Sequence, residues 1–177
     1  HQLGLTHRDI KPANLMITGG GTLKILDFGL SRLDSSHWSS HGGSRSEKNS
    51  ATLPDMFLGT PGYVSPEQIA NASRADIRSD IYSLGCTLYF LLAGCSPFRR
   101  DSVVQTLHAQ QTEPLPDLRQ SRKDIPKSLV DILDRMTAKH PEDRFATPRE
   151  LLETLDSVEL PSVNDPAVST RVELVED

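Results

Sequence analysis

One segment constrains the fold more than any other: residues 81–93, IYSLGCTLYFLLA, are almost wholly apolar. The segment is too short to cross a membrane as a helix, which takes about 20 residues. A helix that is apolar on every side usually forms the centre of a globular core. Asp80 comes directly before the segment, where a carboxylate suits the N-terminus of a helix. The sequence therefore predicts a globular domain built around one buried helix.

Apolar residues at helical spacing mark three further helices. They are Val103, Val104 and Leu107 in one helix, Leu129, Ile132, Leu133 and Met136 in the next, and Leu151, Leu152, Leu155 and Val158 in the last. The last helix begins with Thr147-Pro148-Arg149-Glu150, a capping-box pattern with proline at the first helical position. We therefore expect residues 52–158 to be mainly helical.

Composition excludes several classes of protein. Of the 177 residues, 36% are hydrophobic and 24% are charged, which is typical of a soluble globular chain. The formal net charge of −5 argues against a nucleic-acid partner, because non-specific binding needs a basic surface. No membrane segment is predicted within the chain. Cys86 and Cys95 are too few for a disulfide framework, so we expect buried thiols in a reducing, cytoplasmic compartment.

The two ends and one internal segment differ from the rest in composition. The chain opens His1-Gln2-Leu3, without an initiator Met or a signal-peptide pattern, so we expect a cut or processed N-terminus. Residues 35–51 are rich in Ser, Gly and His and predict a mobile loop. Residues 159–177 predict an acidic linker or disordered tail, which leaves residues 1–158 as the folded domain.

Two short strands and a glycine-rich turn predict a β-hairpin over residues 15–26. Asn14 directly precedes the first strand and Asp27 directly follows the second, so an antiparallel hairpin brings both side chains to the same end. Asp9 is close enough in sequence to face the same site, and Lys11 adds a positive charge. Oxygen ligands at one end of the hairpin suit Mg²⁺, which proteins usually bind together with substrate phosphates.

These residues resemble the catalytic machinery of protein kinases. His7-Arg8-Asp9 through Asn14 resembles the catalytic loop, and Asp27-Phe28-Gly29 resembles the metal-binding motif. Three later segments resemble the substrate-docking segment, the start of the central helix and the late Arg-bearing motif; they span residues 59–67, 79–85 and 140–145. The resemblance covers residues 1–158 and is strongest to the eukaryotic-like (Hanks-type) serine/threonine kinases of bacteria.

The resemblance implies an α+β fold of the protein-kinase type. The expected architecture is a mainly helical C-lobe with a short β-hairpin at the catalytic site and with the N-lobe absent. No Gly-rich loop, strand Lys or helix Glu precedes the catalytic loop in these residues. We therefore expect the chain to lack the N-lobe partner of its parent protein and to have negligible kinase activity alone.

The resemblance also implies a role for each residue of the site. Asp9 accepts or orients the proton of the substrate hydroxyl, and Lys11 stabilises the transferring phosphoryl group. Asn14 and Asp27 hold the Mg²⁺ (or Mn²⁺) that accompanies ATP. Thr60 is a substrate-docking residue, and with Lys11 it indicates protein substrates with Ser or Thr acceptors.

Four residues are expected to be structural. In the family, Asp80 ties down the backbone of the catalytic loop, and Glu67 forms an ion pair with Arg144. His7 is expected to be a packed, hydrogen-bonded side chain rather than a catalytic one.

Regulation by phosphorylation is a further hypothesis. Arg8 precedes the catalytic Asp, and in the family such an Arg binds a phosphate on the activation loop. Ser50 and Thr52 lie at plausible distances before Thr60. A phosphate adds about −1.5 to −2 charge, which is enough to order a loop against a guanidinium.

Three functions remain open from the sequence alone. The first is a serine/threonine protein kinase, incomplete in this chain. The second is a truncated, non-catalytic binding or scaffold module, although such a module has no chemical need for Asp9, Lys11, Asn14 and Asp27 together. The third is a small-molecule phosphotransferase, against which the docking segment at residues 59–67 argues.

Overall fold

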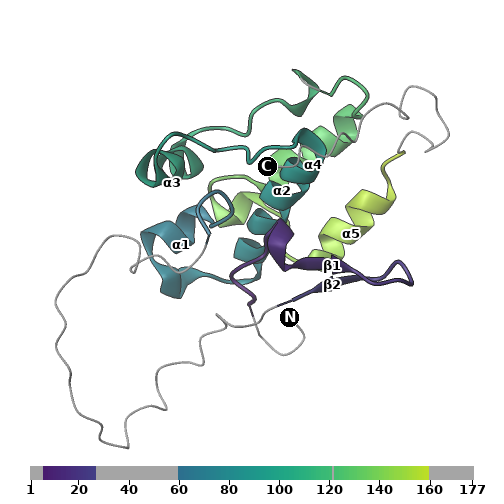
Figure 1. Ribbon diagram of the computed structural model, residues 1–177, viewed down its shortest axis with the longest axis horizontal. Helices are drawn as coiled ribbons and strands as arrows, with labels where there is room; N and C mark the ends of the chain where they lie inside the picture. The colour runs from purple at the N-terminus through teal and green to yellow at the C-terminus, as the bar shows by residue number, and fades with distance from the viewer. Residues whose placement is uncertain (1–5, 27–59, 121, 160–177) are drawn as a thin grey trace, which may run out of the picture.

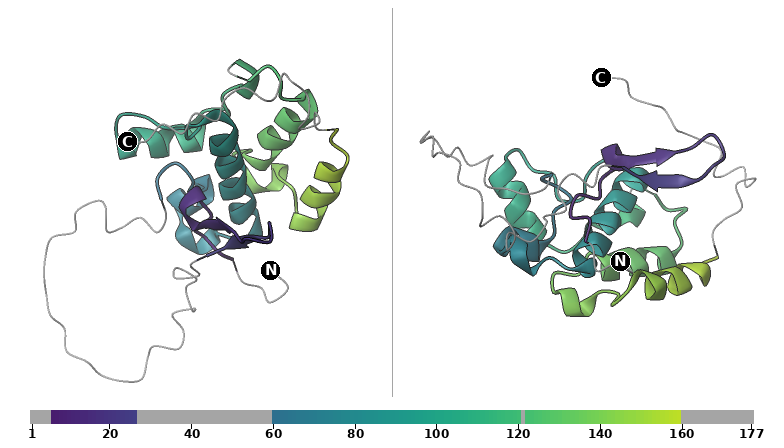
Figure 2. Two further views of the ribbon diagram at one scale, coloured as in Figure 1. Left: turned by 45° about the vertical axis from the view of Figure 1, so that its right-hand side comes forward. Right: turned by 90° about the horizontal axis from the view of Figure 1, so that it is seen from below.

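The computed structural model describes residues 6–26, 60–120 and 122–159, and Figure 1 shows their arrangement. A two-stranded hairpin lies beside a set of helices centred on the long helix α2. The elements are η1 (Pro12–Asn14), β1 (Leu15–Ile17), β2 (Leu23–Ile25), α1 (Pro66–Ala70), η3 (Ala72–Arg74), α2 (Ile77–Ala93), α3 (Val103–Thr112), η4 (Leu118–Gln120), α4 (Lys127–Met136), η5 (Pro141–Asp143) and α5 (Pro148–Asp156). In the second view of Figure 2 the hairpin lies along one face, α4 and α5 lie along the other, and α2 runs between them.

The predicted hairpin is confirmed. β1 and β2 pair antiparallel, with Leu15 opposite Ile25. Gly21 closes the turn at a φ of 78°, in the left-handed region that favours glycine. The Leu26 amide donates to the Asn14 carbonyl at 2.7 Å, so the pairing continues to the end of the hairpin that carries Asn14.

Helix α2 is the predicted central helix, but it begins one turn earlier than expected. Its N-cap is Asp76, whose carboxylate accepts a hydrogen bond from the Arg78 amide at 2.8 Å. Asp80 therefore lies inside the first turn of the helix rather than before it. Burial is not complete along the segment either: Cys86 is fully buried, whereas Leu91 is 61% exposed near the C-terminal end.

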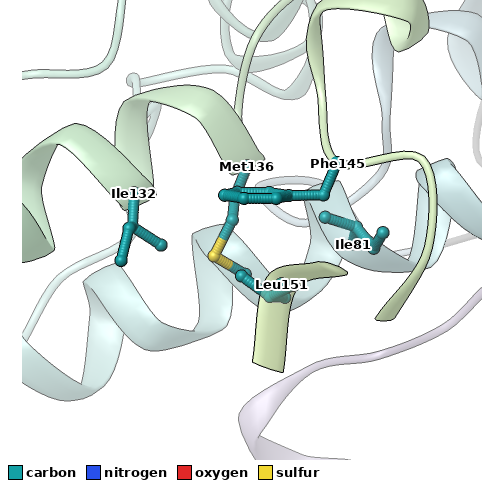
Figure 3. Packing of buried hydrophobic residues seen from close by; sticks show 5 residues of the cluster. All are labelled: Ile81, Ile132, Met136, Phe145 and Leu151. Carbon is teal, nitrogen blue, oxygen red and sulfur yellow. The ribbon is translucent and has the colours of Figure 1, made fainter. Parts of the chain in front are cut away.

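Close packing of α2 against α4 and α5 forms one hydrophobic cluster of the core. Its buried members are Ile81, Ile132, Met136, Phe145 and Leu151, and Figure 3 shows the Met136 side chain lying between Ile132 on one side and Ile81 on the other. Gly85 makes the approach of α2 to α4 possible. A Cβ atom at Gly85 would lie 2.9 Å from the Met136 Cβ and 2.8 Å from the Thr137 Cγ2, closer than such atoms pack.

The helices predicted downstream are all present, but α5 ends at Asp156, before the predicted Val158, and leaves the predicted Leu152 exposed. Two further details differ. The four apolar residues of α4 are buried as expected, whereas α3 buries Leu107 and leaves Val103 and Val104 more than half exposed. At α5, Thr147 caps the helix by accepting from the Glu150 amide at 3.2 Å. The Glu150 carboxylate accepts from the Ala146 amide instead of completing the capping box at Thr147.

The expectation of two buried thiols is half wrong. Cys86 is buried in the core, but Cys95 is exposed just after α2 ends. Within the described ranges, no helix is both long and apolar enough to span a membrane. The predicted mobile loop at 35–51 and nearly all of the predicted tail at 159–177 lie outside the described residues.

Candidate active site

Asp9 lies at the centre of a polar cluster on the predicted catalytic loop, residues 7–14. The Asn14 amide nitrogen donates to the Asp9 carbonyl at 2.8 Å and to the Asp9 carboxylate at 3.0 Å. The Lys11 ammonium lies 2.8 Å from that carboxylate. η1 positions these groups, because Pro12 starts a single tight turn that carries the chain from Lys11 to the buried Asn14.

Thr60 joins this cluster from a distant part of the chain. Its hydroxyl donates to the Asp9 carboxylate at 3.2 Å and accepts from the Lys11 ammonium at 2.7 Å. The structure therefore brings together Asp9, Lys11, Asn14 and Thr60, which were all singled out from the sequence. The same geometry shows that one hydroxyl can contact the carboxylate and the ammonium at once.

Asp80 holds the backbone of the catalytic loop from inside α2. Its two carboxylate oxygens accept hydrogen bonds from the amides of His7 and Arg8, both at 2.8 Å. Arg8 has a φ of 68°, a left-handed conformation that is uncommon outside glycine and that these bonds stabilise. Burial raises the pKa of the Asp80 carboxyl even though the two amides and nearby positive charges favour its ionised form.

Glu67 and Arg144 form the predicted ion pair. Two guanidinium nitrogens of Arg144 each donate to a Glu67 carboxylate oxygen at 2.8 Å, and the Arg144 side chain is fully buried. All five N–H groups of this guanidinium have partners, since Arg144 also donates to the carbonyls of Ala138, Lys139 and Arg78. Burial acts to raise the pKa of Glu67, but Arg144 and the Ser79 hydroxyl outweigh it and lower that pKa.

The segment that follows Thr60 is fixed to the helices by its backbone. The Gly62 carbonyl accepts from the Ser96 hydroxyl at 3.3 Å, and the Tyr63 carbonyl accepts from the Ser83 hydroxyl at 2.8 Å. Gly62 has a φ of 98°, and a Cβ there would lie 2.8 Å from the Ser96 oxygen. Glycine is therefore required where the predicted docking segment, which the structure describes from residue 60 to residue 67, passes the loop between α2 and α3.

Two polar residues of this region were missed by sequence reasoning. Gln110 is fully buried on α3 and Lys139 is half-buried before η5. The Lys139 ammonium lies 3.9 Å from the centre of the Phe98 ring, and burial lowers its pKa to about 8. One signal for Gln110 was available: it follows Leu107 by three residues, which places it on the buried face of the helix.

The described residues fit part of a magnesium site. Asn14 carries a side-chain oxygen, the donor type that Mg²⁺ prefers, and Asp9 fixes this amide by accepting from its nitrogen. Among the described residues, no group of three or more His, Cys, Asp or Glu side chains could hold a metal ion by itself. Asp27, predicted as the second ligand, lies outside the described residues, as do the predicted phosphorylation sites Ser50 and Thr52.

Comparison with known proteins assigns the chain to a family. Residues 1–155 match the family described as "Protein kinase domain". The serine/threonine-protein kinase PknB of Mycolicibacterium smegmatis is 38% identical over 152 residues, and PknB of Mycobacterium leprae shows the same identity. Each match covers 85% of this chain and 22% of the relative.

A probable serine/threonine-protein kinase of Clostridium acetobutylicum is 34% identical over 174 residues, 97% of this chain and 24% of that protein. The chain thus spans less than a quarter of the length of these curated relatives. The family match nevertheless covers most of its residues, and the cluster around Asp9 has the make-up of the catalytic loop that the sequence predicted. The chain belongs to the protein kinase domain family.

Proposed function

We propose that this chain carries the catalytic loop and the substrate-docking segment of a serine/threonine protein kinase. One observation carries the proposal: the Thr60 hydroxyl contacts both the Asp9 carboxylate and the Lys11 ammonium. An acceptor hydroxyl needs the same two partners, a carboxylate to take or orient its proton and a cation beside the transferring phosphoryl group. The names of the relatives, all serine/threonine-protein kinases, support the same substrate class.

The proposed reaction transfers the γ-phosphoryl group of ATP to a Ser or Thr side chain of a protein substrate. The acceptor oxygen bonds to the γ-phosphorus, the bond from that phosphorus to the β–γ bridging oxygen breaks, and the acceptor proton passes toward Asp9. Lys11 offsets the negative charge on the transferring group. Mg²⁺, when bound, neutralises phosphate charge, and Asn14 and Asp27 are the residues that would hold it.

We further propose that this chain is the C-lobe of its kinase domain and works with an N-lobe. Apolar side chains of the hairpin support this: Met16, Ile17, Leu23, Ile25 and Leu26 are each at least 40% exposed. Exposed apolar side chains gathered on one small element are typical of a surface that another part of the protein covers. In the family, the N-lobe supplies the Gly-rich loop and the strand Lys that bind the phosphates of ATP.

A comparison of two proteins tests the function. We predict that the 177-residue chain alone transfers negligible phosphate to a generic Ser/Thr protein substrate. The protein translated with its in-frame upstream sequence is expected to transfer phosphate if that sequence encodes a Gly-rich loop and a strand Lys. Asp9→Asn in the longer protein should lower kcat by at least about a hundredfold, the range of general acid–base contributions, with little change in the KM for ATP.

Two outcomes would contradict these proposals. Phosphate transfer by the chain alone that Asp9→Asn abolishes would refute the dependence on an N-lobe. An upstream sequence without nucleotide-binding motifs, together with no phosphate transfer, would favour the scaffold function.

Phosphopeptide mapping of active protein tests the proposal that a phosphate on Ser50 or Thr52 binds Arg8. That proposal is wrong if residues 31–60 carry no phosphate.

A further inference from the structure

A buried side-chain amide joins α3 to the docking segment. The Gln110 side-chain oxygen accepts from the Gly62 amide at 3.2 Å, and its nitrogen donates to the Val64 carbonyl at 2.8 Å. Gln110 therefore satisfies one donor and one acceptor on either side of Tyr63. It binds this backbone as a neighbouring β-strand would, although the atoms come from a helix.

The main chain of Gln110 is also fixed to the core. Its carbonyl accepts from the Lys139 ammonium at 2.8 Å and from the Tyr82 hydroxyl at 3.3 Å. Tyr82 belongs to α2, and Lys139 lies between α4 and η5. Four hydrogen bonds thus link one residue of α3 to three other parts of the molecule.

The position of this link gives it a consequence for the reaction site. Thr60, which contacts Asp9 and Lys11, lies two residues before Gly62 on the same short segment. The bonds at Gly62, Tyr63 and Val64 hold the docking segment on the C-terminal side of Thr60. A shift of the backbone at Gly62 would move Thr60 relative to the Asp9 carboxylate.

We infer that Gln110 is a positioning residue for the protein substrate: its side-chain amide holds the docking segment where Thr60 meets Asp9 and Lys11. The inference rests on the proposed kinase function and adds a residue on α3 to it. Gln110 itself touches neither Asp9 nor the acceptor position. Its effect is expected on the use of the protein substrate and not on the binding of ATP.

Gln110→Glu tests this inference through protonation. A protonated Glu can still donate to the Val64 carbonyl, whereas an ionised Glu directs an oxygen at that carbonyl and lacks the donor. Gln111 is the next residue of α3 and is exposed, so Gln111→Glu adds the same charge without touching the docking segment. Ionisable groups beside Gln110 include Lys139 and Tyr82 at its carbonyl and Tyr63 between its two backbone partners, and all three are unchanged in both variants.

The kinetic experiment uses the longer, active protein at about pH 5.5 and about pH 7.5, where Lys139 stays mostly charged. We expect Gln110→Glu to lower kcat/KM for the protein substrate about tenfold relative to Gln111→Glu at the higher pH, the size of one lost buried hydrogen bond. The loss should shrink at the lower pH, while the KM for ATP stays the same. Equal values for the two variants, or an equal change in the KM for ATP, would overturn the inference.

A second measurement on the 177-residue chain does not depend on kinase activity. Hydrogen exchange of the Tyr63 amide, which donates to the Thr60 carbonyl at 3.1 Å, reports how firmly the docking segment is held when it is compared with its intrinsic rate at each pH. An ionised Glu can still accept from the Gly62 amide but repels the Val64 carbonyl, so we expect about tenfold faster exchange in Gln110→Glu than in Gln111→Glu at the higher pH, and a smaller ratio at the lower pH. If no protein transfers phosphate while this exchange result holds, the kinase proposal is wrong but the contact of Gln110 with the docking segment is supported. Equal exchange in the two variants would contradict that contact.

Discussion

At the scale of single residues, the site depends on carboxylates whose partners differ in kind. Asp80 faces two backbone amides, whereas Glu67 faces a guanidinium. Burial raises the pKa of the Asp80 carboxyl. At Glu67 burial is also the largest single effect and acts to raise the pKa, but Arg144 and the Ser79 hydroxyl together outweigh it and lower that pKa. The contributions of the two carboxyl groups to the stability of the fold therefore change with pH in opposite directions.

Glu67 gives a testable pH dependence. Its pKa in the folded chain lies below that of the unfolded chain, so the pair stabilises the fold above the unfolded pKa and loses this effect as pH falls through the folded pKa. Glu67→Gln leaves the buried Arg144 without a counter-charge. We expect it to lower the unfolding free energy by about 3 kcal/mol at neutral pH.

The difference between wild type and Glu67→Gln should shrink as pH falls below about 4.5, where Glu67 becomes protonated in the unfolded chain and then in the folded one. Urea denaturation followed by circular dichroism at several pH values measures it. Glu153→Gln, at an exposed position on α5, is the matched control and should change stability little. A difference that stays constant down to low pH would contradict the assigned ion pair.

Residues with family motifs were predictable, and residues defined only by packing were not. Asp9, Lys11 and Asn14 lie within one short motif, and the family resemblance placed Thr60 with them. Gln110 lies in no such motif: its spacing from Leu107 indicates the buried face of the helix, but nothing in the local pattern indicates which groups it contacts. Its partners, Gly62 and Val64, are 48 and 46 residues away in sequence.

At the scale of elements, sequence patterns predicted which helices form better than where they begin. The apolar segment at 81–93 predicted α2, but the helix starts at Ile77 because Asp76 caps it. Asp80, four residues after Asp76, accepts from the His7 and Arg8 amides instead of capping the helix. The family resemblance predicted that long-range contact, whereas the local sequence pattern around Asp80 predicted a helix cap.

The contact between α2 and α4 gives a prediction at this scale. We expect Gly85→Ala to destabilise the chain by about 1–3 kcal/mol through overpacking, partly offset by the gain of about 1 kcal/mol in helix propensity. Thr137→Ser removes the nearest clashing atom and keeps a hydroxyl that can donate to the Leu133 carbonyl, so the double variant should recover part of the loss.

Thermal denaturation of the single and double variants measures both effects. Gly20→Ala is the control, because a Cβ at that position in the hairpin turn would meet no atom within 4 Å. If Gly85→Ala is as stable as this control, α2 and α4 are not as close as described.

At the scale of the whole molecule, the helices form a core that is largely independent of the hairpin. One hydrophobic cluster joins α2, α4 and α5, and a second joins α2 to the segments that contain Leu118 and Ile125 and to α4. The hairpin adds exposed apolar surface rather than core. This division agrees with a chain that folds as a helical unit and presents one apolar edge to another part of the kinase.

The contrast between the two cysteines has a consequence for following how that core opens. Cys86 is fully buried beside Tyr82 and Phe98, and burial raises the pKa of its thiol to about 12, whereas Cys95 is exposed. An alkylating reagent reacts with a thiolate, so native chain should be modified once, at Cys95. Modification of Cys86 then requires the packing around α2 to separate.

Alkylation of the two thiols therefore measures how often the core around α2 opens. Mass spectrometry of alkylated peptides should show a fast phase at Cys95 and a much slower one at Cys86, and the ratio of the two rates estimates how often the central helix is exposed. Comparable rates at both thiols would mean that the interior around α2 is open to reagent in the native state.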